Sequence, residues 1–539
     1  MYTPLGTDGA DRDTSARSVR LSPALSFLTR YGFDTETLQR IELRAAAFGA
    51  EPLDVLLRYG HMRERDYFRA LAIDLGLDFE EPNPVGTAPL FDVPSPRAVE
   101  LQSKILHGRT ISDGARTAYL APDANSIAEL RALVERRPSQ SRSAIAITTR
   151  ACARSHMEAR ARPALLRNAI DGLRERLPLF SARTTIMPRQ AVILLILLQV
   201  LIGIAFFAPG LVALAFHLTA SMFYLACVTL RLLALADFSP ARRRVSAPGE
   251  VQVDRGQDHL LPVYSVVVAL YDEANQVFAL LDALTRLDWP LERLEIVLVC
   301  EGDDEATLTA AYRARAAWPD GLIRIEAVPP SHPRTKPKAL NYALPLCRGD
   351  YLVIYDAEDR PDPMQLREAY TNFRKDRDGT LACLQAPLVI HNSDEGFLPR
   401  LFTVEYSSLF DGLLPYLARK RLPLPLGGTS NHFRMDLLRD VGGWDAHNVT
   451  EDADLGLRIA RNGLRISTLR HPTLEEAPVD FLPWLKQRTR WFKGWFQTWL
   501  VHMRHPIRQM RELGWRGTIA FHVLVTGMVV SALVHPVLL

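Results

Sequence analysis

Two long apolar runs near the middle of the chain predict membrane helices. Residues 191–208 and 211–230 are 18 and 20 residues long and contain no Asp, Glu, Lys or Arg. Each is about long enough to cross a hydrocarbon layer of ~30 Å as a helix. Only Pro209 and Gly210 separate them. The pattern therefore predicts a transmembrane hairpin over 189–231 with both ends on one side of the membrane. A buried helical hairpin of a soluble protein is the alternative.

Basic residues flank this hairpin and predict its orientation. Four arginines precede it and three follow it: Arg174, Arg176, Arg183 and Arg189, then Arg242, Arg243 and Arg244. Because positive charge favours the cytoplasmic side, both flanks are expected in the cytoplasm. A third apolar run, 517–539, predicts another membrane helix. The polar start of the chain is unlike a signal peptide. We expect a multi-pass protein of a bacterial-type inner membrane.

Between the hairpin and the third run, strand and helix patterns alternate. Four β-branched apolar segments are each followed by a polar helical pattern: 264–271, 294–301, 322–328 and 350–359. Such alternation is typical of an α/β domain with a mostly parallel sheet. The pattern predicts such a domain over 250–480.

Acidic residues follow three of these strands. They are Asp272 and Glu273, then Glu301, Asp303 and Asp304, then Asp356, Glu358 and Asp359. A single acid at such a place is typical of a turn or a helix cap. In open parallel sheets, however, ligands bind beyond the carboxyl ends of the strands. Three strands that end alike therefore indicate a site.

Composition narrows the class of function. There are 64 basic and 61 acidic residues, a formal charge of +3, so nucleic acid is not an expected partner. The five cysteines have neither zinc-site spacing nor an even, disulfide-like arrangement, which favours a reducing compartment.

Seven short motifs occur in an order that resembles the membrane-bound family 2 glycosyltransferases, the group that contains cellulose and chitin synthases. They are YDE (271–273), CEGDD (300–304), TKPKALN (335–341), YDAED (355–359), GGTSNHFR (427–434), TED (450–452) and QRTRW (487–491). The resemblance implies a GT-A-like α/β nucleotide-sugar transferase domain. It also implies inverting, processive transfer of sugar, with UDP-glucose as the expected donor and a growing β-linked polysaccharide as the acceptor.

The resemblance assigns donor-side roles to several residues. Asp356 with Glu358 or Asp359 is expected to hold Mg²⁺ or Mn²⁺, since a carboxylate-bound divalent ion stabilises the charge of a diphosphate leaving group. Lys336 is expected to meet the donor phosphates, with Lys338 as the alternative. Tyr271 and Glu273 are expected to bind substrate, and Glu301 and Asp303 are expected near the uridine of the donor.

The TED motif supplies the expected catalytic acids. Inverting transfer needs a base that takes the proton of the attacking hydroxyl, and the resemblance assigns this role to Asp452, with Glu451 beside it. The segment 449–463 has the spacing of a helix that begins near Thr450. In the alternative interpretation, Thr450 caps this helix and the two acids only favour its dipole.

The aromatic and basic segment 481–505 predicts a helix that lies in the membrane interface. Its Gln487, Arg490 and Trp491 match the Gln-x-x-Arg-Trp pattern of the family. Arg490 is expected to pair with the diphosphate, and Trp491 to face the acceptor sugar.

The N-terminal residues 21–160 form a separate predicted unit, small and of α+β class. The segments 40–81 and 117–138 resemble the N-terminal domain of type II secretion and type IV pilus ATPases, and this implies a regulatory or docking role. Some of these domains bind cyclic di-GMP through a motif whose first residues differ from residues 50–53 of this chain. The partner of this region is therefore either cyclic di-GMP or a protein. Residues 1–20 and 137–143 predict a tail and a loop.

Two other functions stay open, namely single transfer of a sugar to a lipid phosphate and a catalytically dead scaffold. The Gln-x-x-Arg-Trp pattern favours processive synthesis over single transfer, and the filled acidic positions argue against a scaffold. Three membrane helices are few for enclosing a polymer. We therefore expect a shortened version of a longer protein, or a subunit whose channel another chain completes.

Overall fold

The centre of the molecule is a seven-stranded sheet. The structure, a computed structural model, describes residues 20–81, 105–112, 115–124, 126–136, 145–237 and 255–531. The sheet order is β13-β10-β12-β8-β5-β6-β7. Its strands are β5 (Tyr264–Leu270), β6 (Leu294–Glu301), β7 (Ile323–Val328), β8 (Tyr351–Tyr355), β10 (Leu381–Gln385), β12 (Asn431–Arg434) and β13 (Arg465–Thr468).

All neighbouring strands in this sheet run parallel except the pairs that include β12. The prediction of a mostly parallel sheet is confirmed, and each of the four predicted strands is present. The strand expected over 350–359 is shorter, because β8 ends at Tyr355 and the acidic residues after it form a turn.

Both faces of the sheet are covered, which explains why its strands are apolar throughout. On β6, Ile296 and Leu298 pack on one side, while Val297 and Val299 pack on the other. The first side is covered by α11 (Val277–Leu284), α12 (Glu305–Ala316) and α14 (Gln365–Lys375); the second is covered by α13 (Lys336–Ala343) and α7 (Arg150–Arg176).

Further elements surround this sheet. They are a small three-stranded sheet and several helices: β9 (Arg360–Pro361), β11 (Leu388–Ile390), β14 (Thr473–Glu475), α15 (Phe397–Tyr406), the π-helix η8 (Ser407–Leu413), α16 (Leu414–Arg419), α17 (Met435–Asp440), α18 (Glu451–Arg461) and α19 (Phe481–His502). The predicted helices near 449–463 and 481–505 correspond to α18 and α19.

The N-terminal region has its own apolar core. Its elements are α1 (Pro23–Ser26), α2 (Thr35–Phe48), α3 (Pro52–Arg58), α4 (Glu64–Leu75), α6 (Ser126–Glu135) and the sheet β1 (Asp78–Phe79), β4 (Ile145–Ile147), β3 (Ala115–Pro122) and β2 (Ile105–Ser112). The expected tail over 1–20, apart from its last residue, and the expected loop over 137–143 lie outside the described residues.

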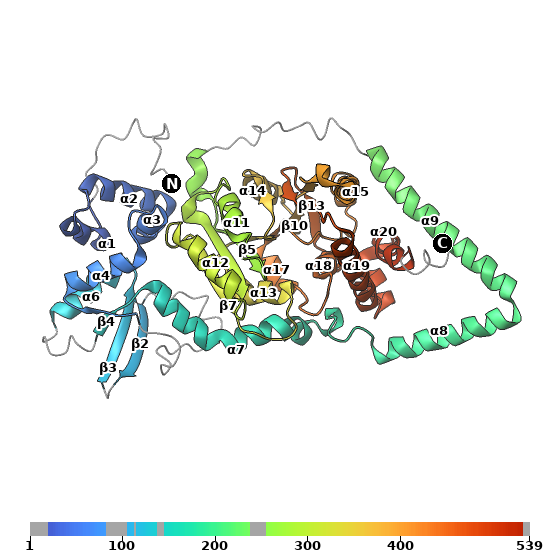
Figure 1. Ribbon diagram of the computed structural model, residues 1–539, viewed down its shortest axis with the longest axis horizontal. Helices are drawn as coiled ribbons and strands as arrows, with labels where there is room; N and C mark the ends of the chain where they lie inside the picture. Colours follow the sequence, from blue (N-terminus) through green and yellow to red (C-terminus); the bar gives the residue numbers. More distant parts are fainter. Residues whose placement is uncertain are drawn as a thin grey trace.

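Helix α7 leaves the N-terminal region and runs along α13 towards the membrane hairpin (Figure 1). The hydroxyl of Thr149 begins the helix by accepting a hydrogen bond from the backbone N–H of Cys152 at 3.1 Å. The expected domain boundary at residue 160 falls inside this helix. The N-terminal region and the central domain therefore share a continuous element.

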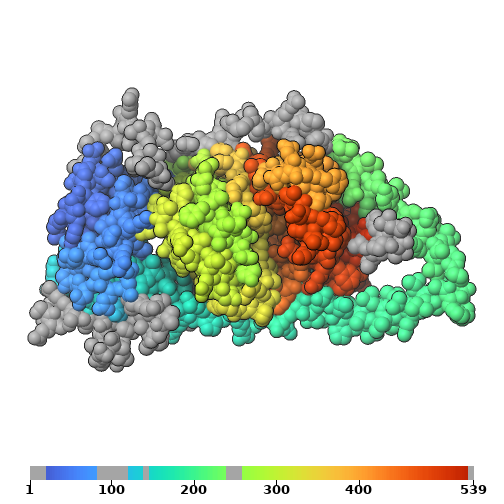
Figure 2. All heavy atoms as spheres, in the orientation of Figure 1, coloured from blue at the N-terminus to red at the C-terminus, as the bar shows by residue number. Residues whose placement is uncertain are grey.

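Within the described residues, three helices are long and apolar enough to cross a membrane, by length and composition: Pro188–Phe207 (α8), Pro209–Asp237 (α9) and Pro506–Ser531. The first two project from the body and meet at the tip of a V (Figures 1 and 2). The third begins before the predicted residue 517, but Gly514, with φ of 68°, interrupts it there. Residues 532–539 lie outside the described part. The five cysteines are free thiols.

Candidate active site

The acids predicted at the strand ends gather at one edge of the sheet, as expected from parallel strands. After β5 the chain turns at Asp272, which has a left-handed φ of 59°. Its backbone N–H donates to Asp304 at 2.7 Å. Asp304 also accepts from the backbone of Thr307 at 3.1 Å and so caps α12. For Asp304 the ordinary capping role therefore holds, and the other acids remain to be explained.

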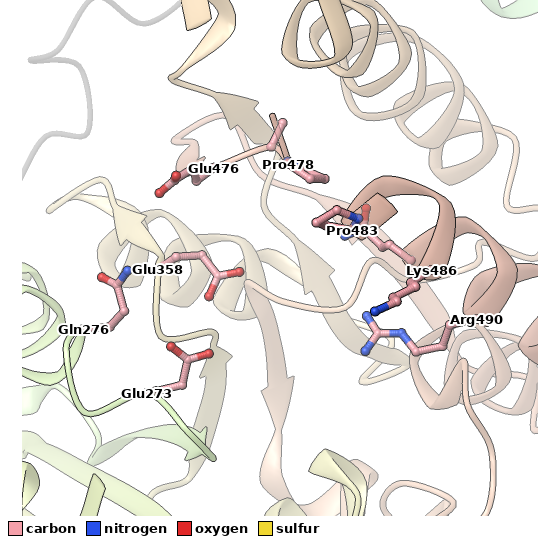
Figure 3. A pocket seen from close by; sticks show the side chains of 10 residues that line it. Glu273, Gln276, Glu358, Glu476, Pro478, Pro483, Lys486 and Arg490 are labelled. Carbon is pink, nitrogen blue, oxygen red and sulfur yellow. The ribbon is translucent and has the colours of Figure 1, made fainter. Parts of the chain in front are cut away.

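A cavity of about 550 Å³ opens beside these acids (Figure 3). One wall is acidic and carries Glu273, Glu358 and Glu476, while the opposite wall is basic and carries Lys486 and Arg490. Gln487 also lines it. The structure thus brings together residues that are far apart in the sequence. A cavity with opposed charges suits a ligand that carries both a diphosphate and a bound cation.

Asp356 and Asp359 lie in the turn after β8. Asp359 is fully buried, and its Oδ2 accepts hydrogen bonds from the backbone N–H of Asp356 at 2.8 Å and from the hydroxyl of Thr429. Its other oxygen, Oδ1, is buried without a partner. An unpartnered buried carboxylate oxygen is costly unless a cation or a proton reaches it.

These two carboxylates fit a divalent ion that the donor completes. No three His, Cys, Asp or Glu side chains in the described segments converge as a preformed metal cage. Mg²⁺ is usually held by one or two carboxylates together with substrate phosphates, so a full cage is not required. Asp356 and Asp359, whose Oδ1 has no partner, can supply these one or two carboxylates. Glu358 lines the cavity beside them.

The acidic wall carries more negative charge than its neighbours compensate. Burial and the nearby Glu358 and Asp356 raise the pKa of Glu273 to about 7. Burial also raises the pKa of Glu358, and it raises the pKa values of Asp359 and Glu475 well above the usual range. Strongly raised carboxyl pKa values in a cleft are typical of functional sites.

Lys336 is the cation nearest to the acids after β8. It is the first residue of α13, and its Nζ donates to Asp356 and to the carbonyl of Gly428 at 2.7 Å. Although burial opposes the charged form, Asp356 and Glu451 raise the pKa of Lys336. Lys338, the alternative considered above, is instead buried in an ion pair with Glu301 at 2.8 Å.

The residues expected at the donor nucleotide separate into a buried and an exposed set. Glu301 is only 3% exposed and is paired with Lys338. Tyr271 and Asp303 lie at the surface, where Arg334 joins them. The Arg334 guanidinium donates to the Tyr271 hydroxyl at 2.9 Å, contacts Asp303 and lies 5.1 Å from the centre of the Tyr271 ring. The exposed three form a cluster at the carboxyl ends of β5 and β6.

Glu451 and Asp452 occupy the first turn of α18. An ideal Cβ on Gly428 would lie 3.4 Å from Asp452 Oδ2, so this carboxyl faces the same loop that accepts from Lys336. Burial raises the pKa of Glu451 to about 8 and that of Asp452 to about 6. A pKa near 6 suits a base that must be ionised at neutral pH and still take a proton.

Thr450 is the N-cap residue of α18, but the expected cap by its side chain is wrong. The Thr450 side chain makes no cap hydrogen bond, and its hydroxyl instead pairs with that of Thr498 on α19 at 3.2 Å. Gly494 allows this close approach of the two helices, since a Cβ there would lie 2.4 Å from Thr450 Cγ2. The start of α18 is therefore fixed by its packing on α19.

Two residues of the Gln-x-x-Arg-Trp pattern line the cavity, and the third packs against a neighbouring helix. Gln487 and Arg490 line the cavity. Trp491 does not line it: its ring lies 6.3 Å from that of Phe402 and 4.8 Å from the Arg488 guanidinium, between centres. Arg488 in turn donates to Glu405 of α15 at 2.7 Å. In this structure Trp491 therefore joins α19 to α15.

Several residues of this site were not expected from the sequence. They are Glu475, Glu476, Thr429, Arg334 and Lys486. The first two form an acidic pair at the end of the short strand β14, with Glu475 as its last residue and Glu476 directly after it. The same signal marks the ends of β5, β6 and β8. That strand has only three residues and was not predicted, so its acids went unnoticed.

The mostly parallel sheet has a GT-A-like glycosyltransferase fold, and comparison with known families agrees. Residues 262–494 match the family model described as "Glycosyltransferase like family 2". This segment therefore matches family 2 glycosyltransferase domains, which confirms the predicted fold and enzyme class.

Individual relatives match less than half of the chain. "Probable glycosyltransferase YdaM" of Bacillus subtilis is 25% identical over 236 residues, which are 43% of this chain and 55% of the relative. "Beta-monoglucosyldiacylglycerol synthase" of Trichormus variabilis is 26% identical over 245 residues, 44% of this chain and 50% of the relative. The chain thus spans about half the length of these curated relatives.

A solved structure of the mannosyltransferase PcManGT from Pyrobaculum calidifontis, in complex with GDP-Man and Mn²⁺, overlays with a TM-score of 0.40. The sequence identity is 21%, and the match covers 59% of this chain and 92% of that one.

Proposed function

We propose that the protein transfers a sugar from a nucleotide-diphosphate donor to a hydroxyl acceptor, with inversion at the anomeric carbon. The observation that carries the proposal is the convergence at Gly428. Lys336 donates to its carbonyl, and the Asp452 carboxyl lies against its Cα. Asp356, bonded to the same lysine, and Asp359, bonded to the next residue, complete the group.

The residues divide into a leaving-group side and an acceptor side. Lys336 and Arg490 would offset the negative charge that grows on the diphosphate as the glycosidic bond breaks. Asp356 and Asp359 would hold Mg²⁺ or Mn²⁺, which supplies Lewis-acid stabilisation when bound. The Asp452 carboxylate would accept the proton of the acceptor hydroxyl while that oxygen bonds to the anomeric carbon.

We take UDP-glucose as the first donor to test and a growing β-linked polysaccharide as the first acceptor. Among the relatives, a probable glucomannan 4-beta-mannosyltransferase of Arabidopsis thaliana, 24% identical over 263 residues, is named for polymer synthesis. The Gln487 and Arg490 side chains in the cavity support the same choice, because they complete the pattern that suggested processive synthesis.

A lipid acceptor is the second candidate, and exposed apolar side chains favour it. Phe481, Leu482 and Leu485 begin α19, next to the cavity residues Lys486 and Gln487, and are 43–66% exposed. Such a surface suits a membrane interface from which a lipid headgroup can enter. The name of the Trichormus variabilis relative refers to diacylglycerol and also supports this candidate.

We place the protein in a cytoplasmic-type membrane, with the catalytic domain and N-terminal region on the cytoplasmic side. The basic flanks of the hairpin support this placement, as do its two apolar helices, whose most hydrophobic stretches have no buried residue. We assign the N-terminal region a regulatory or docking role, with cyclic di-GMP or a protein as its partner. Calorimetry with cyclic di-GMP on the full chain separates the two, since no heat would leave only the docking role.

The test of function is a donor panel on the purified chain in lipid nanodiscs. UDP- and GDP-linked sugars are added with Mg²⁺ or Mn²⁺, and nucleotide diphosphate release is measured with and without acceptors. Linkage-specific glycosidases and mass spectrometry then separate polymer from glycolipid. Asp378→Asn, at an exposed acid outside the site, is the matched control. Absence of release and of transfer with every donor would support the scaffold alternative and overturn the proposal.

A further inference from the structure

A second cluster of buried charges lies behind the proposed base and takes no part in the mechanism above. It centres on Asp454, which is two residues after Asp452 and fully buried. Asp454 accepts hydrogen bonds from Arg458 Nη2 and from His502 Nε2, each at 3.0 Å. His502, the last residue of α19, is only 1% exposed.

The protonation of this cluster follows from its donors. Arg461 Nη1 lies 3.2 Å from His502 Nδ1, and an arginine can only donate, so Nδ1 must accept. The proton of the neutral ring is then on Nε2, which donates to Asp454. Burial lowers the pKa of His502, although Asp454 opposes this shift. Burial disfavours ionised Asp454, but Arg458 and His502 outweigh it and lower the pKa of Asp454.

The cluster connects three helices and one loop. Arg458 donates to the carbonyls of Val441 and Gly443, both at 2.8 Å, which ties α18 to the loop before it. Arg461 Nε donates to Glu512 of α20 (Pro506–Phe521) at 2.7 Å, and α20 begins the third candidate membrane span. Every bond is buried or half-buried, so water does not compete freely for it.

We propose that Asp454 and His502 are positioning residues that lock α18 against α19. Asp452 lies at the start of α18, and Arg490 lies on α19 three turns before His502. The Asp454–His502 bond is a direct polar link between these two helices. This bond therefore fixes the distance between Asp452, which would receive the acceptor proton, and Arg490, which would face the diphosphate. This inference rests on the function proposed above.

The test compares His502→Phe with His502→Gln in the full chain. Phenylalanine keeps the ring that packs 5.9 Å from Phe180 and 6.2 Å from Phe521, but it cannot donate to Asp454. We expect kcat to fall about 100-fold, as for a small misplacement of reacting groups, with the donor KM unchanged. Glutamine carries an Nε2 donor and should restore most of the rate. Arg508→Gln, which removes an exposed contact to Glu512, is the control and should leave the rate unchanged.

Hydrogen exchange measures the lock without turnover. In His502→Phe, backbone amides of 449–455 should exchange faster, while those of β5 stay protected. Unchanged exchange would overturn the inference, as would a normal kcat despite faster exchange, or an equal loss in the Phe and Gln variants. If the wild-type chain transfers no sugar, the proposed function fails, and the exchange result alone decides whether the two residues lock α18.

Discussion

Carboxylates at the amino ends and at the carboxyl ends of the central strands have different surroundings, and their pKa values shift in opposite directions. At the amino end of β6, Glu295 is 4% exposed and accepts from Ser265 at 2.6 Å, from Arg324 at 3.1 Å and from the backbone of Arg348 at 2.9 Å. Burial opposes its ionisation, but Arg324 and Arg348 outweigh it and lower its pKa to about 2. At the carboxyl end, Glu273 faces other acids, and its pKa is raised to about 7.

This difference separates charges that support the fold from charges that serve a ligand. Glu295 has a hydrogen-bond donor for each oxygen, and the protein stabilises its ionised form. Glu273 and Glu358 are partly or wholly screened from water and face other acids, and Asp359 has donors for only one of its oxygens, so the folded protein alone disfavours their ionised forms. A ligand that brings positive charge would relieve that cost. The predictions below neutralise a carboxylate at one end or the other.

The largest expected effect is on catalysis at the carboxyl end. Asp452→Asn should lower kcat by about 1,000-fold, because the amide keeps the shape of the side chain but cannot accept a proton. Donor affinity should stay near that of the wild type, since Lys336 and Arg490 are untouched. Steady-state rates of nucleotide diphosphate release and donor titration by calorimetry check this. A rate within an order of magnitude of the wild type would remove Asp452 from the base role.

At the amino end, the expected effect is on stability. Glu295→Gln should lower the free energy of unfolding by about 3 kcal/mol, because one carboxylate oxygen becomes an NH₂ group that faces buried donors. Urea unfolding followed by tryptophan fluorescence in mild detergent measures it. Asp282→Asn, which removes the exposed pair with Arg286, is the control and should cost at most about 0.5 kcal/mol. Equal effects of the two variants would contradict the comparison.

Removal of the divalent ion should again affect the carboxyl end alone. Chelator should abolish transfer, and Asp356→Ala should lower it by about 100-fold, since Lewis-acid stabilisation is worth several kcal/mol. Mn²⁺ should raise the melting temperature of the wild type, because a ligand that binds only the folded state stabilises it. The Asp356→Ala protein should show no such rise. Full activity in excess chelator would exclude a metal role for these acids.

Much of the fold was predictable because its signals are local. The four parallel strands and helices α18 and α19 follow from apolar periodicity, and the helical hairpin α8–α9 follows from the length of two uncharged runs. The short strands β9, β11 and β14 were missed, because two or three residues carry no periodicity. The course of α7 along α13 was missed as well, because its buried residues Leu165 and Ala169 lie in a mostly polar helix.

The candidate site was predictable in its residue types but not in its pairings. Lys336 and Lys338 look equivalent in TKPKALN, yet only Lys336 reaches Asp356, while Lys338 is buried against Glu301. The sequence motif predicts that Trp491 faces the acceptor sugar, but in the structure its ring packs on Phe402 and Arg488. Such choices depend on which face of a helix is buried, and tertiary packing decides this.

The pH dependence of transfer sharpens the comparison at the base itself. Burial raises the pKa of Asp452 to about 6, above its usual range, and only the ionised form can accept the acceptor proton. We therefore expect kcat at saturating donor to fall about tenfold per pH unit below about pH 6 and to level off above it. The control Asp378→Asn should share the wild-type profile. An acid limb near the ordinary aspartate pKa would contradict the assignment.

The smallest expected effect is a gain in stability from the removal of an uncompensated charge. The pKa of Glu273 is about 7 in the folded protein, against 4.5 as its ordinary value. Between these values the folded state binds more protons than the unfolded state, so the contribution of this residue becomes less favourable as pH rises through the window. Glu273→Gln avoids that cost. In EDTA, it should stabilise the protein by about 1 kcal/mol at pH 8, a value discounted for partial exposure, and by less at pH 5. Urea unfolding at both pH values measures this.

With Mn²⁺ and donor present, the gain in stability of Glu273→Gln should shrink, because the ligand then compensates the wild-type charge. A loss of stability at pH 8 would instead place Glu273 with Glu295, among the charges that support the fold.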